Sequence, residues 1–234
     1  LPNQAFMHKL VCDDGCTVTR VDQLPEGLKL YDRPGYKYLY GQVAPGEYTY
    51  NVYLSNGKVQ PVKLIVKEQL PQPKPFMGIL TWNAFDEHIS HDIILEISDA
   101  LVNFGLRDAG YRYMCIDDKW AEFNRKDNHL VPVTNKFPDL KMLTDKVHQK
   151  GLKIGIYSDA GNYTCSMAQP GSYNFEPTDA ADFVKWGFDL LKYDFCNSTG
   201  GNTAEEAELA YHTMGNALDK AMLNAGKQPQ DFLF

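Results

Sequence analysis

The 234-residue chain is 44% hydrophobic, 12% aromatic and 23% charged, a composition that excludes disordered and collagen-like chains and can supply a sizeable core. Its formal net charge of -7 and the lack of a run rich in Lys and Arg argue against nucleic-acid phosphates or an anionic membrane surface as a partner. No stretch approaches the roughly 20 apolar residues that a membrane-spanning helix needs. The chain starts at Leu1 without a basic-then-apolar signal, so we expect it to be processed or cut from something longer.

The first segment, residues 1–68, is dense in strand and turn signals. Residues 48–53 alternate an aromatic or methyl-bearing side chain with a polar one, Asn56-Gly57 supplies a two-residue turn, and residues 59–66 resume the alternation. This pattern predicts a β-hairpin. The stretches LPEGL at 24–28 and APGEY at 44–48 resemble Ig-like modules of extracellular bacterial proteins. The resemblance implies an all-β, sandwich-type domain over residues 1–68.

Residues 69–75 contain three prolines that disfavour both helix and central strand, so they are expected to form a semi-rigid linker. Beyond the linker, short β-rich runs alternate with helical patterns, which is typical of a parallel α/β sheet. The expected strands are 76–82, 111–117, 152–158, 189–195 and 231–234, and the expected helices are 91–104, 140–150, 178–186 and 203–225.

The spacing of these strands suits a (β/α)8 TIM barrel. Residues 76–234 amount to about five-eighths of the roughly 250 residues that a complete barrel needs. We therefore expect this chain to hold the first five strands of the barrel, with the remainder of its own polypeptide as the partner that completes it.

Working residues of such barrels lie at the carboxyl ends of the strands, and these ends are acidic and aromatic here. They read Trp82-Asn83, Asp117-Asp118, Tyr157-Ser158-Asp159 and Lys192-Tyr193-Asp194. Because side chains alternate along a strand, Lys192 and Asp194 point to the same side. A lysine beside a carboxylate keeps it ionised, the state required of an anionic nucleophile or of a metal ligand. The spacing alone does not choose between these roles.

Five blocks, in the correct order, resemble glycoside hydrolase family 27, whose characterised members are mainly α-galactosidases and α-N-acetylgalactosaminidases. They are MGILTWNAF at 77–85, DAGY at 108–111 with CIDDKW at 115–120, KGLKIGIYSDAG at 150–161, Cys165 with PGS at 170–172, and WGFDLLKYDFC at 186–196. The resemblance covers about residues 76–234.

Position by position, the resemblance implies that Asp194 is the nucleophile of a retaining glycosidase. Lys192, Asp117 and Asp118 would hydrogen-bond the sugar hydroxyls, and Trp82, Tyr157 and Cys165 would form the walls of the sugar pocket. The general acid/base would lie after the sixth strand, beyond Phe234. The implied reaction uses no metal and no cofactor.

The resemblance also implies a disulfide between Cys165 and Cys196, and hence an extracytoplasmic location: secreted, periplasmic or at the cell surface. A second disulfide common in the family would need cysteines where this chain has Glu87 and Lys119, and we predict an ion pair between these two side chains instead. Cys115, inside an expected strand, is predicted to be a buried free thiol. A local bridge between Cys12 and Cys16 is left open.

Three functions follow from these observations. The leading one is a retaining exo-α-galactosidase, or an α-N-acetylgalactosaminidase or other α-glycosidase of the same family. The second is a carbohydrate-binding or interaction unit without catalysis. The third is a metal-dependent barrel enzyme with oxygen ligands from clustered carboxylates, against which the charge of Lys192 argues. The carboxylates would be Asp117, Asp118, Asp159 and Asp194.

Overall fold

The computed structural model describes residues 6–10, 16–33, 36–67, 76–197 and 203–234. The chain divides into two compact units, Leu1–Lys74 and Pro75–Phe234, each of which is described by itself. The predicted linker at 69–75 and the possible bridge from Cys12 lie outside the described residues. No helix of the described part is both long enough and apolar enough to cross a membrane.

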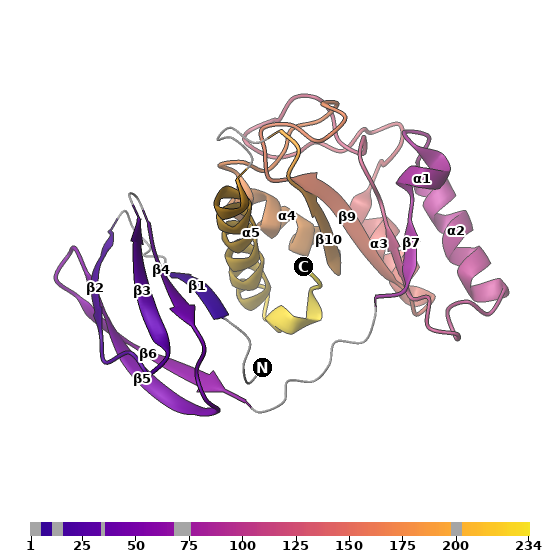
Figure 1. The fold of residues 1–234 in the computed structure, drawn as a ribbon. Coiled ribbons are helices and arrows are strands. Elements are labelled where there is room, and N and C mark those ends of the chain that lie inside the picture. Colours follow the sequence, from indigo (N-terminus) through magenta and orange to yellow (C-terminus); the bar gives the residue numbers. More distant parts are fainter. Residues whose placement is uncertain (1–5, 11–15, 34–35, 68–75, 198–202) are drawn as a thin grey trace. The chain divides into compact units, whose positions relative to one another are not determined.

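The first unit contains two three-stranded antiparallel sheets (Figure 1). One sheet has the order β1 (Phe6–Leu10), β4 (Tyr36–Gly41), β3 (Leu28–Arg33), and the other has the order β2 (Val18–Asp22), β5 (Gly46–Leu54), β6 (Val59–Val66). The pairing of β5 with β6 confirms the predicted hairpin.

Both sheets of the first unit contribute to one hydrophobic core. Leu28 and Leu39 come from one sheet, and Val18, Tyr50 and Val52 come from the other. Gly27 makes the turn into β3: its φ is +93°, and a Cβ at this position would lie 1.8 Å from the carbonyl oxygen of residue 42. Only glycine fits this turn without strain.

The second unit is an α/β unit with a parallel sheet, as predicted. The sheet order is β10, β9, β8, β7, so strands that are neighbours in the chain are also neighbours in the sheet. The strands are β7 (Gly78–Leu80), β8 (Tyr113–Cys115), β9 (Lys153–Asp159) and β10 (Leu190–Asp194); the helices are α1 (Trp82–Phe85), α2 (His91–Asn103), α3 (Leu140–Gln149), α4 (Glu176–Trp186) and α5 (Ala204–Asn224).

Side-chain caps define where three of the helices begin. Ser90 accepts a hydrogen bond from the amide of Ile93 at the start of α2, and Asp139 accepts one from Met142 at the start of α3. Thr203 and Glu206 form a reciprocal capping box at the start of α5. These caps fix the lengths of the loops that follow the strands, and those loops carry the candidate site.

Two expectations about element type were wrong. Residue 82 does not end the first strand, because the ladder between β7 and β8 stops at Leu80 and the amide of Phe85 then bonds the carbonyl of Thr81, which starts the short helix α1. The predicted strand at 231–234 is reduced to one parallel bridge between Leu233 and Leu190, because a 3-10 helix at Pro229–Asp231 occupies the approach to it. Even so, Leu233 lies beside β10, where a fifth parallel strand belongs.

The core of the second unit lies between the sheet and its helices. Ile154 of β9, Leu143 of α3 and Phe183 of α4 are fully buried, and Trp120 from the loop after β8 packs edge-on against Phe183. The loops that follow β8 and β9 gather at one edge of the sheet, the upper edge in Figure 1. This is the edge formed by the carboxyl ends of the strands.

Candidate active site

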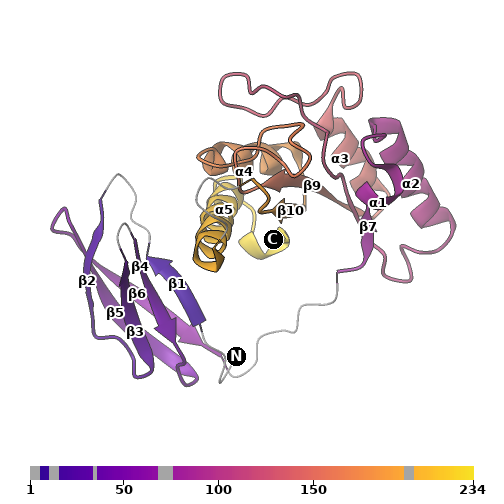
Figure 2. The ribbon, with the colours of Figure 1, turned by 45° about the horizontal axis from the view of Figure 1, so that its top comes forward.

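Three parallel strands bring their terminal polar residues together at this edge, which is turned toward the viewer in Figure 2. Lys192 pairs in register with Tyr157, and Asp194 pairs with Asp159. Asp117 follows β8 by two residues. In-register parallel strands end side by side, so carboxylates far apart in sequence become neighbours in space.

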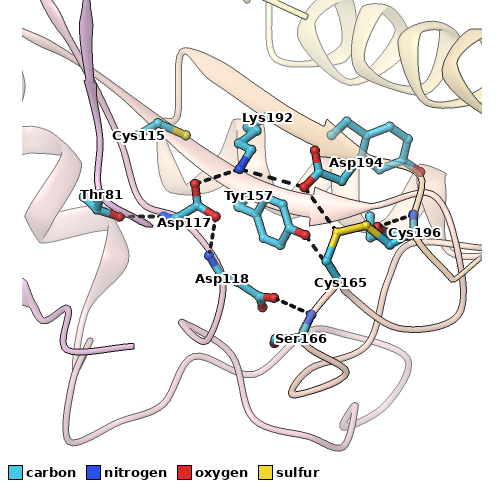
Figure 3. A network of polar contacts seen from close by, with 12 residues as sticks. Thr81, Cys115, Asp117, Asp118, Tyr157, Cys165, Ser166, Lys192, Asp194 and Cys196 are labelled. Carbon is cyan, nitrogen blue, oxygen red and sulfur yellow. Dashed lines mark hydrogen bonds and ion pairs between the residues drawn. A yellow bond between two sulfur atoms is a disulfide. The ribbon is translucent and has the colours of Figure 1, made fainter. Parts of the chain in front are cut away.

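Lys192 is the centre of this group (Figure 3). Its Nζ lies 2.9 Å from Asp117 Oδ2, 3.8 Å from Asp194 Oδ2 and 4.9 Å from the centroid of the Tyr157 ring. Burial alone would lower the pKa of Lys192, but the hydrogen bond to Asp117 and the charges of Asp117 and Asp194 outweigh burial and raise this pKa above its usual value. Lys192 therefore remains a cation at neutral pH, with a carboxylate on each side.

The two adjacent aspartates are buried and held by backbone amides. Asp117 and Asp118 are 2% and 3% exposed. The amide of Asp117 donates to Thr81 Oγ1 at 3.0 Å, the amide of Asp118 donates to Asp117 Oδ1 at 3.0 Å, and the amide of Ser166 donates to Asp118 Oδ2 at 3.3 Å. Both carboxylates are thus oriented before any ligand binds.

The predicted disulfide between Cys165 and Cys196 is confirmed, and it lies against the candidate nucleophile. Cys165 Sγ is 3.4 Å from Asp194 Oδ2 and 3.7 Å from Asp159 Oδ2. A disulfide sulfur has no proton to donate, so these are packing contacts. The disulfide joins the loop after β9 to the end of β10 and packs beside Asp194 and Asp159; that Cys165 forms a wall of a sugar pocket stays a prediction.

Tyr157 lies against the Lys192 ammonium, whereas Trp82 lies on α1, next to Thr81, whose hydroxyl accepts a hydrogen bond from the amide of Asp117. Tyr157 is 1% exposed, its hydroxyl accepts a hydrogen bond from the amide of Cys165 at 3.4 Å, and burial raises its pKa. Trp82 is half-buried on α1, and the ammonium of Lys119 lies 6.0 Å from the centroid of its ring. Lys119 links Trp82 to the polar group, because its backbone amide donates a hydrogen bond to Asp118 Oδ1.

The predicted ion pair between Glu87 and Lys119 is also confirmed. Lys119 Nζ lies 2.9 Å from Glu87 Oε2. This pair lowers the pKa of Glu87 and raises that of Lys119, in both cases chiefly through the hydrogen bond between the two side chains. It ties the segment after α1 to the loop after β8. Cys115 is a buried free thiol, as predicted, and burial raises its pKa.

Asp159, expected from the sequence only as a possible metal ligand, is held by backbone amides. Its side chain is fully buried, Oδ1 accepts from the amide of Gly161 at 2.7 Å, and Oδ2 accepts from the amide of Cys196 at 2.9 Å. Burial raises the pKa of Asp159, and these backbone hydrogen bonds oppose that rise. Asp159 and Asp194 each end a strand, and parallel pairing places them side by side; this shared strand-end position is the sequence signal that points to Asp159 as a neighbour of Asp194.

The arrangement does not favour a four-aspartate metal centre. Among the described residues, potential ligand atoms converge within 4.8 Å at Asp159, Cys165 and Cys196, and the two sulfurs there are joined to each other. The ammonium of Lys192 lies between Asp117 and Asp194, where a cation bound by both carboxylates would have to sit. The geometry instead suits a neutral polyhydroxy ligand, which can donate to carboxylates and accept from an ammonium.

Comparisons with known proteins agree with this chemistry. The family model described as alpha galactosidase A matches residues 75–227. Alpha-galactosidase of Cyamopsis tetragonoloba is 45% identical over 155 residues, which are 65% of this chain and 36% of that protein. Alpha-galactosidase of Oryza sativa subsp. japonica is 49% identical over 146 residues, 62% of this chain and 34% of that protein. This chain thus spans about a third of the length of these curated relatives.

Solved structures give the same result. Alpha-galactosidase I from Mortierella vinacea superposes with a TM-score of 0.61 at 39% identity. The aligned region covers 66% of this chain and 38% of the Mortierella chain. Alpha-galactosidase from Saccharomyces cerevisiae, solved with raffinose, superposes with a TM-score of 0.61 at 35% identity. The aligned region covers 66% of this chain and 33% of the yeast chain. A family model that matches well over half of a chain, on the same residues that form the polar site, leaves one assignment: the chain belongs to the alpha galactosidase A family of glycoside hydrolases.

Proposed function

We propose that the protein containing this chain is a retaining exo-α-galactosidase, with Asp194 as its nucleophile. The observation that carries the proposal is the position of Lys192, whose ammonium lies between Asp117 and Asp194 at the carboxyl edge of the sheet. An ionised carboxylate beside a fixed cation and two oriented acidic hydrogen-bond acceptors is what a retaining glycosidase needs around the sugar.

In the proposed reaction, an Asp194 oxygen attacks the anomeric carbon of a terminal α-linked galactose. A glycosyl ester forms as the glycosidic C–O bond breaks, and the departing oxygen takes a proton from a carboxylic acid on the other side of the sugar. Water then attacks the same anomeric carbon while the acid residue, now a base, takes a proton from the water; the bond from this carbon to the Asp194 oxygen breaks, and Asp194 leaves as a carboxylate. The acid/base is expected outside these 234 residues, in the part of the barrel that follows.

Recognition of the sugar is assigned to the groups around the nucleophile. Asp117, Asp118 and Lys192 would bind the hydroxyls; hydrogen bonds to charged groups contribute about 1.5–3 kcal/mol each. Tyr157, Trp82 and the disulfide at Cys165 would enclose the ring. Because Asp117 and Lys192 already hold each other, little side-chain freedom is lost when a ligand binds.

The surrounding organisation is part of the proposal. Residues 76–234 would form the first part of a (β/α)8 barrel completed by further polypeptide. Residues 1–68 would form an Ig-like β-sandwich module and residues 69–75 a linker. The disulfide between Cys165 and Cys196 supports an oxidising, extracytoplasmic location.

The test is hydrolysis of 4-nitrophenyl α-galactoside and of its N-acetylgalactosamine counterpart by the whole gene product. Galactoside turnover that is lost in Asp194→Asn and retained in Asp145→Asn is the expected result. Asp145 is a suitable control because it lies on the exposed side of α3, paired with Lys141. Preference for the N-acetylated substrate would reassign the sugar, and no turnover of either substrate by a folded protein would favour the non-catalytic function.

A further inference from the structure

Two aromatic rings form a stacked pair on the loops above the candidate site. The rings of Phe123 and Tyr163 have centroids 5.6 Å apart and planes inclined by 17°. Phe123 is 52% exposed, and Tyr163 is half-buried. Stacking covers one face of each ring, so the exposure of Phe123 comes from its edge and its opposite face. The pair therefore presents a small, flat aromatic surface, of the kind on which an apolar face of a ligand packs.

The loop after β8 is tied to the loop after β9 on both sides of Phe123. Two residues before it, the amide of Ala121 donates to Gln169 Oε1 at 2.9 Å. Two residues after it, Arg125 Nη2 donates to the carbonyl of Gly171 at 2.8 Å, and the Arg125 guanidinium holds the buried Asp179. Phe123 is therefore presented by a braced loop.

Tyr163 is equally well anchored, and it is close to the reaction centre. Its backbone bridges to Pro170, and its carbonyl accepts from Asn197 Nδ2 at 3.4 Å. Tyr163 precedes Cys165 by two residues, so their Cα atoms are at most about 7 Å apart. The sulfur of Cys165 lies 3.4 Å from Asp194 Oδ2. The aromatic pair thus lies at the margin of the site rather than on a remote surface.

The site itself and its margin differ in chemistry. The groups around Asp194 are charged and suit the hydroxyls of the sugar that is cleaved, whereas Phe123 and Tyr163 offer a flat apolar surface. The C–H faces of a pyranose ring pack on such a surface, because an aromatic face carries partial negative charge and C–H groups carry partial positive charge. A pre-oriented ring pair costs little entropy on binding.

We propose that Phe123 and Tyr163 form an aromatic platform that binds the sugar unit attached to the galactose being released. This inference rests on the proposed α-galactosidase function. The ligand class is a neutral oligosaccharide with a terminal α-galactose, and the platform selects it over galactosides that carry no second ring.

The test compares two substrates of the whole gene product. One is the disaccharide in which galactose is α-1,6-linked to glucose, and the other is α-galactosyl fluoride, whose leaving group is a single atom. The variants Phe123→Ala and Tyr163→Ala should lower kcat/KM for the disaccharide about threefold to tenfold, the range expected for one lost aromatic contact, through a higher KM. Turnover of the fluoride should stay the same.

Two further variants serve as controls. Tyr163→Phe keeps the ring and should behave as the wild type. Phe104→Ala removes an aromatic side chain that is 80% exposed at the end of α2, at the opposite edge of the sheet, and should change neither substrate.

Each other outcome overturns the platform. An equal loss on both substrates would show that the pair only braces the loops, and an unchanged disaccharide reaction would show that the rings do not touch the second sugar. A Tyr163→Phe variant as poor as Tyr163→Ala would assign the effect to the hydroxyl. If the wild type does not turn over the fluoride, the proposed function itself fails, and that result is distinct from the other three.

Discussion

Lys192 Nζ and Asp117 Oδ2 lie 2.9 Å apart, although 75 residues separate them in the chain. The side chain of Asp117 is 3% exposed, so its charge is largely removed from water. A buried carboxylate of this kind is stable only with a partner cation and hydrogen bonds. Lys192 thus supports the fold of the strand ends as well as the proposed chemistry.

Replacing Lys192 with Met should reduce catalysis strongly. The variant removes a cation from the proposed sugar site and leaves Asp117 without its partner, so we expect kcat/KM for 4-nitrophenyl α-galactoside to fall by a factor of about 10 to 150. Lys192→Arg should be only slightly more active than Lys192→Met, because a planar guanidinium does not fit the position of an ammonium.

The matched control for this variant is Lys153→Met. Lys153 lies at the amino end of the neighbouring strand β9, over the ring of Tyr113. It should retain the activity of the wild type. Similar losses in both variants would show that general destabilisation, and not the position of Lys192, explains the effect.

Asp159→Asn should affect kcat more than KM. Both carboxylate oxygens accept amides, from Gly161 and from Cys196, and an asparagine side chain can satisfy only one of them. One buried N–H would lose its acceptor, at a cost of about 1–3 kcal/mol in the free energy of unfolding. Because Cys196 is two residues from Asp194, the proposed nucleophile should also lose its alignment. Steady-state kinetics and urea unfolding measure the two effects.

The pH dependence identifies the contribution of Asp159. Burial raises its pKa in the folded state, so the folded protein binds more protons than the unfolded chain between the usual aspartate pKa and the raised one. The stability that this group contributes is therefore complete below the usual pKa and is lost as pH rises through the raised pKa. Asp159→Asn removes this loss, so the stability difference between wild type and variant should shrink as pH rises through this window. A constant difference would contradict the prediction.

Glu87→Gln should lower Tm at pH 7, and by less at pH 3, which is below the usual glutamate pKa. The pKa of Glu87 is lowered by its hydrogen bond to Lys119, so the stability that it contributes is present above the usual glutamate pKa and is lost as pH falls through the lowered one. Glu96→Gln, at an exposed position on α2, is the matched control. An equal change of Tm in Glu87→Gln at both pH values would show that packing, and not charge, matters at residue 87.

Arg125→Met should destabilise the second unit by about 3–5 kcal/mol, the usual cost of leaving a buried charge without its partner. Arg125 holds both oxygens of Asp179, which is fully buried, at 2.7 Å. Urea unfolding measures the change. The double variant Arg125→Met with Asp179→Leu should recover part of the loss, because no charge then remains buried. A double variant that is less stable than Arg125→Met alone would contradict this explanation.

The elements that sequence patterns predicted well are those with local signals. β9 and β10 are apolar runs that end in polar residues, and α2, α3 and α5 have capping residues at their starts. The hairpin of β5 and β6 is specified by its own turn. By contrast, α1 is a single turn that depends on where the ladder between β7 and β8 ends, and no pattern within the chain marks that point.

The candidate site shows the same division. The strand-end positions of Asp117, Tyr157, Lys192 and Asp194 could be read from spacing, because parallel strands end at one edge. The pairing of Arg125 with Asp179 joins positions 54 residues apart in a loop and a helix, and no periodicity connects them. The stack of Phe123 on Tyr163 is equally non-local. Such contacts depend on how two loops close over each other, which single-chain patterns do not specify.

The sequential order of the parallel strands has a consequence for synthesis. Each strand pairs with the one made just before it: Tyr113 of β8 pairs with Lys153 of β9, and Tyr157 of β9 pairs with Lys192 of β10. A strand that leaves the ribosome therefore finds its neighbour already present and waits for no later segment of the chain. Since domains form from the amino end during translation, the sheet can grow one strand at a time, with each new strand covering the edge formed by the strand made just before it.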